Sequence, residues 1–354
     1  MHVAVALPIV VNAMTLLPTP DKLKLANLPT PIRPLDRLSE KYGGPRIWLK
    51  CDDQTGSVLS GNKIRKLEFC LADALEQGAQ MIITCGGLQS NHCRATALAA
   101  AQLGLQSHLV LRGKKPPDND ADGNYLLDKL SGAAVSVYPP KIYMESLPGL
   151  IAELIEAYSS KGIKAYSIPT GASNAVGIWG YITAAEELLA DFKRLSFSPD
   201  EIFCATGSGG TQAGLTLGMH LAGAKVPVTG FAVCDDNAYF DQKVRQDVLA
   251  WQQRYFPSGA YQDRQLAGIH TDLKVRTIDR YIGAGYAKGY AELYSSISEV
   301  ASLEGVVLDP VYTGKAFHGL LSEIKLGNLS HCSDVLFLHT GGVFGLYPYR
   351  SEFI

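Results

Sequence analysis

The chain has 354 residues, of which 47% are hydrophobic, and a formal net charge of −2. This length allows two packed units, and the near-neutral charge gives no reason to expect nucleic acid or an anionic membrane as a partner. A small molecule is therefore the expected ligand. The seven cysteines are scattered and form no CxxC pair, which favours reduced thiols and no metal site.

The first segment, from Val3 to Met14, is apolar but has no basic start and contains a proline. We interpret it as a packed arm rather than a signal peptide. No apolar run reaches the length of a membrane helix, so we expect a cytoplasmic protein. The proline-punctuated stretch from Pro18 to Pro34 predicts a wrapping segment, and a short helix from Leu35 to Tyr42 follows it.

Predicted strands and helices then alternate along the chain. The expected strands are Arg46–Lys50, Met81–Cys85, Ser107–Leu111, Ala134–Val137, Ala165–Ile168, Glu201–Cys204, Val226–Val233 and Asp334–Leu338. Helical spacing predicts helices after Asn62, over Asn91–Leu103, Asp122–Leu130, Tyr143–Tyr158, up to Ala190 and over Gln212–Leu221. The alternation predicts an α/β fold with two open, twisted, mostly parallel sheets. We expect a large domain of residues 1–64 and 175–354 and a small domain of residues 65–174.

The run from Ser60 to Phe69 places Lys63 where a glycine-containing turn becomes an amphipathic helix. Asn62 is a good N-cap residue, so Lys63 is predicted in the first helical turn. There the helix dipole disfavours the ammonium form, which suits a lysine that forms a Schiff base. A lone lysine at a helix start is more often a solvated surface residue, so this hypothesis depends on the motifs downstream.

A glycine-rich turn runs from Ala205 to Thr211, between a predicted strand and a predicted helix. Its backbone N–H groups can form an anion nest at a helix N-terminus, and Ser208 and Thr211 add hydroxyl donors. This arrangement predicts a phosphate site. It is neither a Walker loop nor a full dinucleotide fingerprint, so ATP and NAD are poorly supported.

Three further polar stretches follow predicted strands or hydrophobic runs: Cys85–His92, Asp309–Lys315 and His339–Gly342. Polar loops at strand ends are where ligands bind in open α/β sheets. A lone histidine after a strand is more often a buried structural residue, so His339 receives no role. A reactive lysine, a phosphate nest and these loops together indicate pyridoxal 5'-phosphate, with Lys63 as its Schiff-base lysine.

The five motifs, in this order, resemble the family of 1-aminocyclopropane-1-carboxylate deaminases and D-cysteine desulfhydrases over roughly residues 25 to 350. The motifs read SGNKxRK, GGxQSN, TGSGGTQAG, LDPVYxGK and HxGG. The resemblance implies the pyridoxal-phosphate fold of the tryptophan synthase β-subunit, with the cofactor between the two domains. It also implies a small amino-acid substrate and a homodimer.

The resemblance assigns roles residue by residue. It gives Lys63 the covalent link to the cofactor and makes Lys66 a phosphate contact beside Ser208, Gly209, Gly210 and Thr211. Asn91 would face the pyridine 3'-oxygen, and Gln89 and Ser90, with Asn91, would bind the substrate. Tyr286 and Tyr312 would stand over the ring and the substrate, and Ser90 would share the proton of the substrate's α-carbon with Lys63.

Thr313 and Thr340 stand where the deaminases of this family have Glu and Leu, and they resemble the desulfhydrase branch. We expect both threonines near the cofactor ring and expect β-elimination from D-cysteine to pyruvate, ammonia and hydrogen sulfide. The alternatives are the deaminase reaction and a lyase acting on another β-substituted alanine, such as cysteate or 3-chloroalanine. A cofactor carrier or sensor without turnover is a further alternative, although carrying the cofactor does not require Ser90, Tyr286 or Tyr312.

Overall fold

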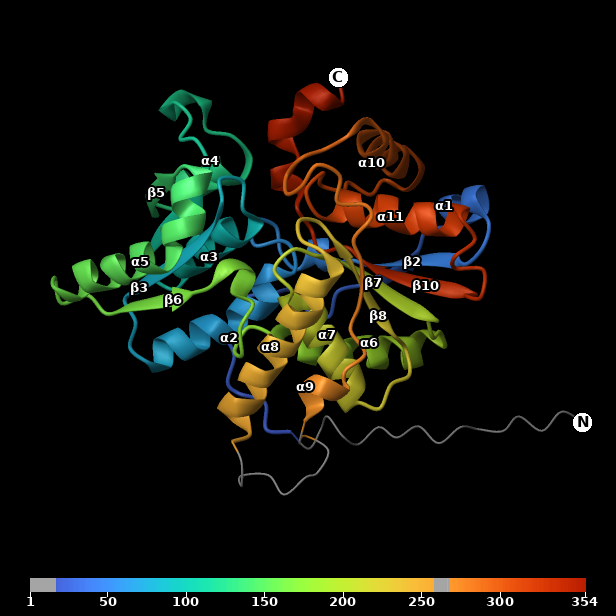
Figure 1. The fold of residues 1–354 in the computed structure, drawn as a ribbon, viewed down its shortest axis with the longest axis horizontal. Helices are drawn as coiled ribbons and strands as arrows, with labels where there is room; N and C mark the ends of the chain where they lie inside the picture. The colour runs from blue at the N-terminus through green and yellow to red at the C-terminus, as the bar shows by residue number, and fades with distance from the viewer. Residues whose placement is uncertain (1–16, 258–265, 267) are drawn as a thin grey trace, which may run out of the picture.

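The computed structural model of the protein describes residues 17–257, 266 and 268–354. The predicted arm from Val3 to Met14 lies outside these residues. Two sheets form the framework of the described chain, and each belongs to one lobe of the molecule (Figure 1). The α/β fold with two mostly parallel sheets is therefore confirmed.

The large sheet has six strands in the described chain. From edge to edge they are β1 (Ile32–Pro34), β2 (Arg46–Lys50), β10 (Asp334–Leu338), β7 (Glu201–Thr206), β8 (Val228–Ala232) and β9 (Arg276–Ile278). All neighbours are parallel except β1, which pairs antiparallel with β2. The strands β1 and β9 are short edge strands that the sequence analysis did not predict.

Helices cover both faces of the large sheet (Figure 1). One face packs against α6 (Trp179–Leu195) and α7 (Gly210–Leu221), and the other against α1 (Asp36–Tyr42), α10 (Ala291–Glu304) and α11 (Thr313–Lys325). Two further helices follow: α8 (Asn237–Tyr255) packs against α7, and α9 (Ile269–Asp272) packs against α8. Apolar side chains on both faces of the central strands explain why those strands read as continuous hydrophobic runs.

The small sheet has the order β5 (Ala134–Tyr138), β4 (Gln106–Arg112), β3 (Met81–Gly87) and β6 (Ala165–Ile168), all parallel. Its helices are α3 (Asn91–Gln102), α4 (Gly123–Leu130) and α5 (Pro140–Ser159). The strand β3 runs two residues past its predicted end, because Gly86 and Gly87 continue the ladder with Leu111 and Arg112. The segment before α4 contains a 3-10 turn, Asp118–Asp120.

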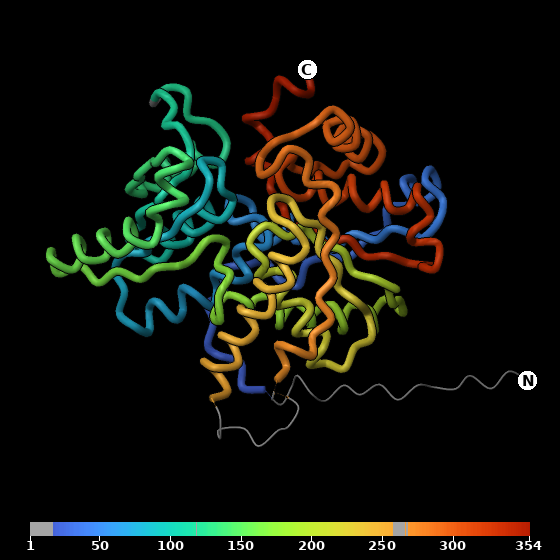
Figure 2. Tube along the Cα trace, viewed as in Figure 1, coloured from blue at the N-terminus to red at the C-terminus, as the bar shows by residue number. Residues whose placement is uncertain are grey.

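The chain passes from the large sheet to the small one through α2 (Lys63–Glu76) and returns before α6 (Figure 2). Ile64, Leu67 and Leu71 are buried, as the helical spacing predicts, but so are all the residues between them, so the first two turns of α2 are covered on every side. The strands of the small sheet all lie between residues 81 and 168, inside the predicted small domain. Strand positions do not fix the boundaries at 64/65 and 174/175, which stay predictions.

The role predicted for Asn62 as a capping side chain is wrong. Asn62 occupies the N-cap position of α2, but its backbone is helical and its side chain caps no N–H group. Its amide instead donates to the hydroxyl of Thr211, at a distance of 2.9 Å. The side chain therefore joins the start of α2 to the start of α7.

Candidate active site

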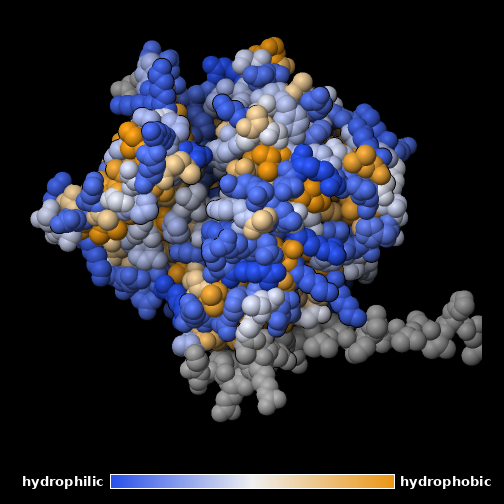
Figure 3. Space-filling view, in the orientation of Figure 1, coloured by the Kyte–Doolittle hydropathy of each residue, from blue (hydrophilic) through white to orange (hydrophobic). Residues whose placement is uncertain are grey.

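A cavity of about 530 Å³ lies where the carboxyl edges of the two sheets face each other. The space-filling view is hollowed here, between the lobe with α4 and α5 and the lobe with α8 and α10 (Figure 3). The volume is usual for a small-molecule site. Of the residues predicted for the site, those that line this cavity are Lys63, Ser90, Asn91, Ser208, Gly209, Thr211, Tyr286, Tyr312 and Thr340. The predicted residues Lys66, Gln89, Gly210 and Thr313 are not part of its lining.

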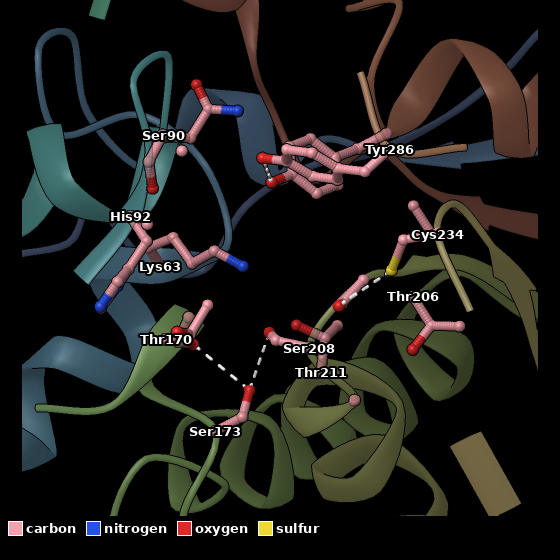
Figure 4. Close-up of a pocket in the computed structure, with 18 of the residues that line it drawn as sticks. Lys63, Ser90, His92, Thr170, Ser173, Thr206, Ser208, Thr211, Cys234 and Tyr286 are labelled. Atoms are coloured by element: carbon pink, nitrogen blue, oxygen red, sulfur yellow. Dashed lines mark hydrogen bonds between the residues drawn. The ribbon is translucent and has the colours of Figure 1, made fainter. Parts of the chain in front are cut away.

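Lys63 is the first residue of α2, and its amine points into the space between Tyr286 and Ser208 (Figure 4). Within the described chain, no hydrogen bond or ion pair engages this amine. Burial lowers the pKa of Lys63 to about 8, although the carboxylate of Asp309 opposes the shift. The uncharged amine is thus a minor form at neutral pH, but it is far more abundant than for an ordinary lysine, which suits a nucleophilic lysine.

The turn between β7 and α7 is the glycine-rich stretch that the sequence predicts to be an anion nest. Gly209 has a φ of +84°, which L side chains rarely adopt, and α7 begins at the next residue. The hydroxyl of Ser208 accepts a 2.9 Å hydrogen bond from Ser173, whose oxygen also accepts the N–H of Gly210 at 3.1 Å. The nest is therefore held in shape from the neighbouring 3-10 turn, Thr170–Ala172.

Lys66 lies beneath the nest rather than in the cavity. Its Nζ donates to the carbonyl oxygen of Gly171 at 3.0 Å and lies 3.4 Å from the hydroxyl of Ser173. A Cβ atom on Gly210 would lie 2.8 Å from this Nζ. Burial, strengthened by the nearby Lys63, lowers the pKa of Lys66 well below its usual value. Lys66 supports the nest from below, and its predicted contact with a phosphate stays a prediction.

The loop from β3 into α3 brings Ser90 and Asn91 to the opposite wall. Ser90 caps α3, because its hydroxyl accepts the N–H of Cys93 at 3.2 Å. Asn91 accepts a hydrogen bond from Asn124 at 2.8 Å. Gln89 points away, since its amide is bonded to the carbonyl of Asp122 and to the N–H of Asn124. The structure thus brings Ser90 and Asn91, but not Gln89, to the cavity.

Tyr286 and Tyr312 meet above the cavity. Their hydroxyl oxygens are 2.6 Å apart, and their rings cross at 69°. Burial raises the pKa of Tyr286 to about 12 and that of Tyr312 well above its usual value. Both phenols are therefore protonated at neutral pH and can donate a hydrogen bond.

Thr340 lines the cavity, but Thr313 is fully buried behind it. The Thr313 hydroxyl donates to Asp309 at 2.7 Å and accepts the Asp309 N–H at 3.0 Å. Asp309 also accepts the N–H groups of Val311 and Tyr312. These hydrogen bonds to Asp309 hold Thr313 in the core, and neither residue lines the cavity in this structure. His339 is a buried structural residue, as predicted, and hydrogen-bonds to backbone groups.

Several lining residues were missed by sequence reasoning. Ser173 and Lys243 flank the nest, and Lys243 forms a 2.5 Å ion pair with Asp247. Arg112, at the end of β4, lines the opposite wall. A polar loop at a strand end could have indicated Ser173 and Arg112, but Lys243 lies inside α8 without a motif.

His92 lies next to Lys63 (Figure 4). Its Nε2 is 2.8 Å from the Thr84 hydroxyl, and its Nδ1 has no hydrogen-bond partner in the described chain. Burial, reinforced by Lys63 and Lys66, lowers the pKa of His92 well below its usual value. The imidazole is therefore neutral and adds no charge beside the reactive amine.

The site has the features that pyridoxal phosphate needs. A Cβ atom on Gly171 would lie 2.2 Å from the hydroxyl of Ser208, so glycine keeps the space next to the nest open. The hydroxyl of Thr206 lines the cavity and is buried without a partner in the described chain. Lys63 faces this cradle with an uncharged amine available. The fold and the site thus define the class of pyridoxal-phosphate enzymes built from two parallel-sheet domains.

Comparison with known proteins agrees with this class. Residues 23–341 match the family described as pyridoxal-phosphate dependent enzyme. The chain is 42% identical over 339 residues to an Arabidopsis thaliana protein named bifunctional D-cysteine desulfhydrase/1-aminocyclopropane-1-carboxylate deaminase, mitochondrial, covering 91% of this chain and 78% of that protein. It is 37% identical over 336 residues to a D-cysteine desulfhydrase of Salmonella schwarzengrund, covering 94% and 97% of the two chains.

A solved structure agrees over nearly the whole chain. A crystal structure described as an ACC deaminase homologue superposes with a TM-score of 0.82, at 34% identity, covering 98% of this chain and 99% of that one. The chain belongs to the pyridoxal-phosphate-dependent enzyme family and, within it, to the 1-aminocyclopropane-1-carboxylate deaminase and D-cysteine desulfhydrase family. Among its described helices, none is both long and apolar enough to cross a bilayer.

Proposed function

We propose that the protein is a carbon–sulfur lyase that removes the β-substituent of a small amino acid, with D-cysteine as the expected substrate. One D-cysteine and one water would give pyruvate, ammonia and hydrogen sulfide. The observation that carries this proposal is the amine of Lys63, with its lowered pKa, which faces Ser90 and the Tyr286–Tyr312 pair across one cavity. Relatives named D-cysteine desulfhydrase support the choice of substrate.

Each part of the site would have a separate task. The nest of Ser208, Gly209 and Thr211 would hold the phosphate, and Lys63 would hold the cofactor covalently until substrate displaces it. Pyridoxal phosphate, when bound, withdraws electrons from the substrate's α-carbon. The freed amine of Lys63, with the hydroxyl of Ser90, would take the α-proton.

The remaining residues would orient the substrate and aid departure of its β-substituent. Ser90 and Asn91, at the N-terminus of α3, would hold the substrate carboxylate, since backbone N–H groups and the helix dipole favour an anion there. The protonated phenols of Tyr286 and Tyr312 can donate to the departing thiolate. Thr340 offers a hydroxyl but no negative charge to the cofactor ring, which suits a leaving group as good as a thiolate.

The deaminase reaction on 1-aminocyclopropane-1-carboxylate is the second candidate, because a Thermotoga maritima relative, 42% identical over 336 residues, is named a putative deaminase of this kind. Other β-substituted alanines and a carrier without turnover complete the alternatives. A substrate panel separates them: D-cysteine, L-cysteine, cysteate, 3-chloroalanine and the cyclopropane amino acid, with pyruvate, 2-oxobutyrate and sulfide measured. Sulfide and pyruvate from D-cysteine support the proposal. Release of 2-oxobutyrate alone would replace it with the deaminase reaction, and no product from any compound would favour a carrier.

We further propose a homodimer in the cytoplasm, as expected from the family and from the frequency of dimers among soluble enzymes. The seven cysteines are free thiols, in keeping with a reducing compartment. Light scattering of the purified protein tests the dimer, and fractionation of the source cells tests the location.

A further inference from the structure

We propose that Arg112 forms an anion-binding subsite that selects amino acids whose β-substituent carries a negative charge. The inference rests on the proposed β-elimination, since it concerns the side-chain end of the same substrate. Arg112 would add to that function a residue that binds the charged leaving group.

The position of Arg112 follows from the small sheet. It is the last residue of β4 and pairs in register with Gly87 of β3, so its backbone lies at the carboxyl edge that faces the cavity. The side chain lines the cavity and is partly exposed to it. The anion nest belongs to the large sheet, so Arg112 stands on the other wall, away from the predicted phosphate site.

Two tyrosine rings hold the guanidinium group. Its Cζ lies 5.0 Å from the ring centroid of Tyr286 and 5.7 Å from that of Tyr143. Tyr286 comes from the loop before α10 and Tyr143 from α5, so the two lobes each supply one ring. Both rings attract the guanidinium cation without neutralising its charge.

The charge of Arg112 has no counterpart within the described chain. No carboxylate of the described residues forms an ion pair with the guanidinium. The one side-chain hydrogen bond of Arg112 there goes to the sulfur of Met144 at 3.4 Å, a weak acceptor. Lys243, another cation of the lining, differs because Asp247 pairs with it. A cavity-facing guanidinium with free N–H donors is suited to an anionic ligand.

The anion that best fits is the substrate's β-substituent. The phosphate is assigned to the nest, and the α-carboxylate to Ser90 and Asn91 at the start of α3. Neither assignment uses Arg112, and Tyr286 places it beside the phenol pair that would meet the departing group. A sulfonate, a carboxylate or a thiolate at this point would be attracted, and planar or trigonal oxyanions could accept two hydrogen bonds from the guanidinium.

The test measures binding rather than turnover. Isothermal titration of the holoenzyme compares 3-sulfopropanoate with butanoate: both carry one carboxylate, only the first carries a second negative charge, and neither has an amine that could react with the cofactor. The variants are Arg112→Met, which removes the charge, and Arg112→Lys, which keeps the charge without the planar fork. Lys114→Met is the matched control, because Lys114 is an exposed cation two residues away that does not line the cavity.

We expect wild type and Lys114→Met to bind 3-sulfopropanoate at least tenfold more tightly than butanoate. Arg112→Met should bind the two ligands about equally, and Arg112→Lys should keep part of the preference. The proposal is overturned if wild type shows no preference, if Arg112→Met retains it, or if Arg112→Met weakens both ligands by the same factor. That last result would mean that Arg112 only holds the lobes together through the two rings. Because neither probe is turned over, a protein that fails to release sulfide from D-cysteine can still pass or fail this test.

Discussion

The hydroxyl oxygens of Tyr286 and Tyr312 lie 2.6 Å apart, although the two residues come from a loop and from the start of α11. Only one of two hydroxyls can donate to the other, so the second proton remains free to point at a bound substrate. The pair thus joins two separate segments and leaves one donor directed at the cavity.

We predict that Tyr286→Phe and Tyr312→Phe each lower kcat by about tenfold or more with D-cysteine, because each removes a hydrogen bond and leaves the other hydroxyl unpartnered. If the two act as a unit, the double variant should be little slower than the worse single variant. A double-mutant cycle on kcat/KM measures this. Strictly additive losses would show that the hydroxyls act independently.

The Lys63→Ala variant should lose the visible absorbance of the bound cofactor and all measurable turnover. Lys63 is the only lysine that we assign to the covalent link, and its amine points into the cavity. Absorbance spectra of the purified variant check the loss, with circular dichroism to confirm that the fold persists. Turnover at the wild-type rate would refute the central assignment.

Lys63 should also make the stability of the apoprotein depend on pH. Its folded pKa of about 8 lies below the unfolded value of about 10.4. Between these values the unfolded chain binds more protons at this site, so this residue's contribution to stability rises with pH. The full effect is at most about 3 kcal/mol at about 1.4 kcal/mol per pH unit. Urea unfolding of apo wild type and apo Lys63→Met at pH 7 and pH 10 should show wild type gaining stability relative to the variant at the higher pH; a constant difference would contradict the lowered pKa.

The nest can be tested with Gly209→Val. The valine backbone would have to adopt a φ of +84°, and its Cβ would lie 3.0 Å from the Lys243 side chain. We expect the dissociation constant of pyridoxal phosphate to rise at least tenfold, since a hydrogen bond to a charged group contributes about 1.5–3 kcal/mol. The matched control is Gly223→Val, which has a φ of +66° but no atom within 4 Å of its Cβ. Equal losses in the two variants would attribute the effect to backbone strain alone.

Thr313→Glu should destabilise the protein. The new carboxylate would be buried against Asp309, whose pKa burial already raises. An unpaired buried charge typically destabilises by about 3 kcal/mol or more. Thr313→Ser keeps the hydroxyl and should remain near wild type in urea unfolding. Unchanged stability of Thr313→Glu would show that the buried site accommodates a second acid.

Thr340→Leu is the cleaner test of substrate choice, since Thr340 lines the cavity while Thr313 does not. The sequence comparison with the deaminases predicts that Thr313→Glu combined with Thr340→Leu shifts the reaction towards cyclopropane opening. We expect Thr340→Leu alone to reduce sulfide release and to give little 2-oxobutyrate. Substantial 2-oxobutyrate from unmodified protein, with no sulfide from D-cysteine, would overturn the substrate assignment.

The sequence predicted a feature correctly where all the residues that form it lie in one short stretch. Helical spacing placed α2 at its observed start, because Ile64, Leu67 and Leu71 must share a buried side. The glycine-rich turn after β7 predicted the nest for a similar reason, since only glycine tolerates the backbone of Gly209. In both cases the physical constraint acts between residues that are close in the chain.

Contacts between residues far apart in the chain could not be predicted from local sequence patterns. Asn62 was expected to cap its own helix, but its side-chain amide donates instead to Thr211, which is 149 residues away in the sequence. Lys243 flanks the nest from inside α8, where no motif predicts it. Thr313 was placed at the cofactor ring by resemblance, whereas hydrogen bonding to Asp309 holds it in the core.

By itself, the sequence determined the alternation of strands and helices, the place of Lys63 at the start of α2 and the glycine-rich turn before α7, because periodicity and glycine backbone freedom are local properties. Only the tertiary structure decided which polar side chains of each motif reach the cavity. Gln89 and Ser90 are neighbours in the chain, yet one bonds to the loop before α4 and the other faces Lys63. Arg112 became a candidate for substrate selection for the same reason, because only the packed structure shows that no carboxylate among the described residues pairs with it.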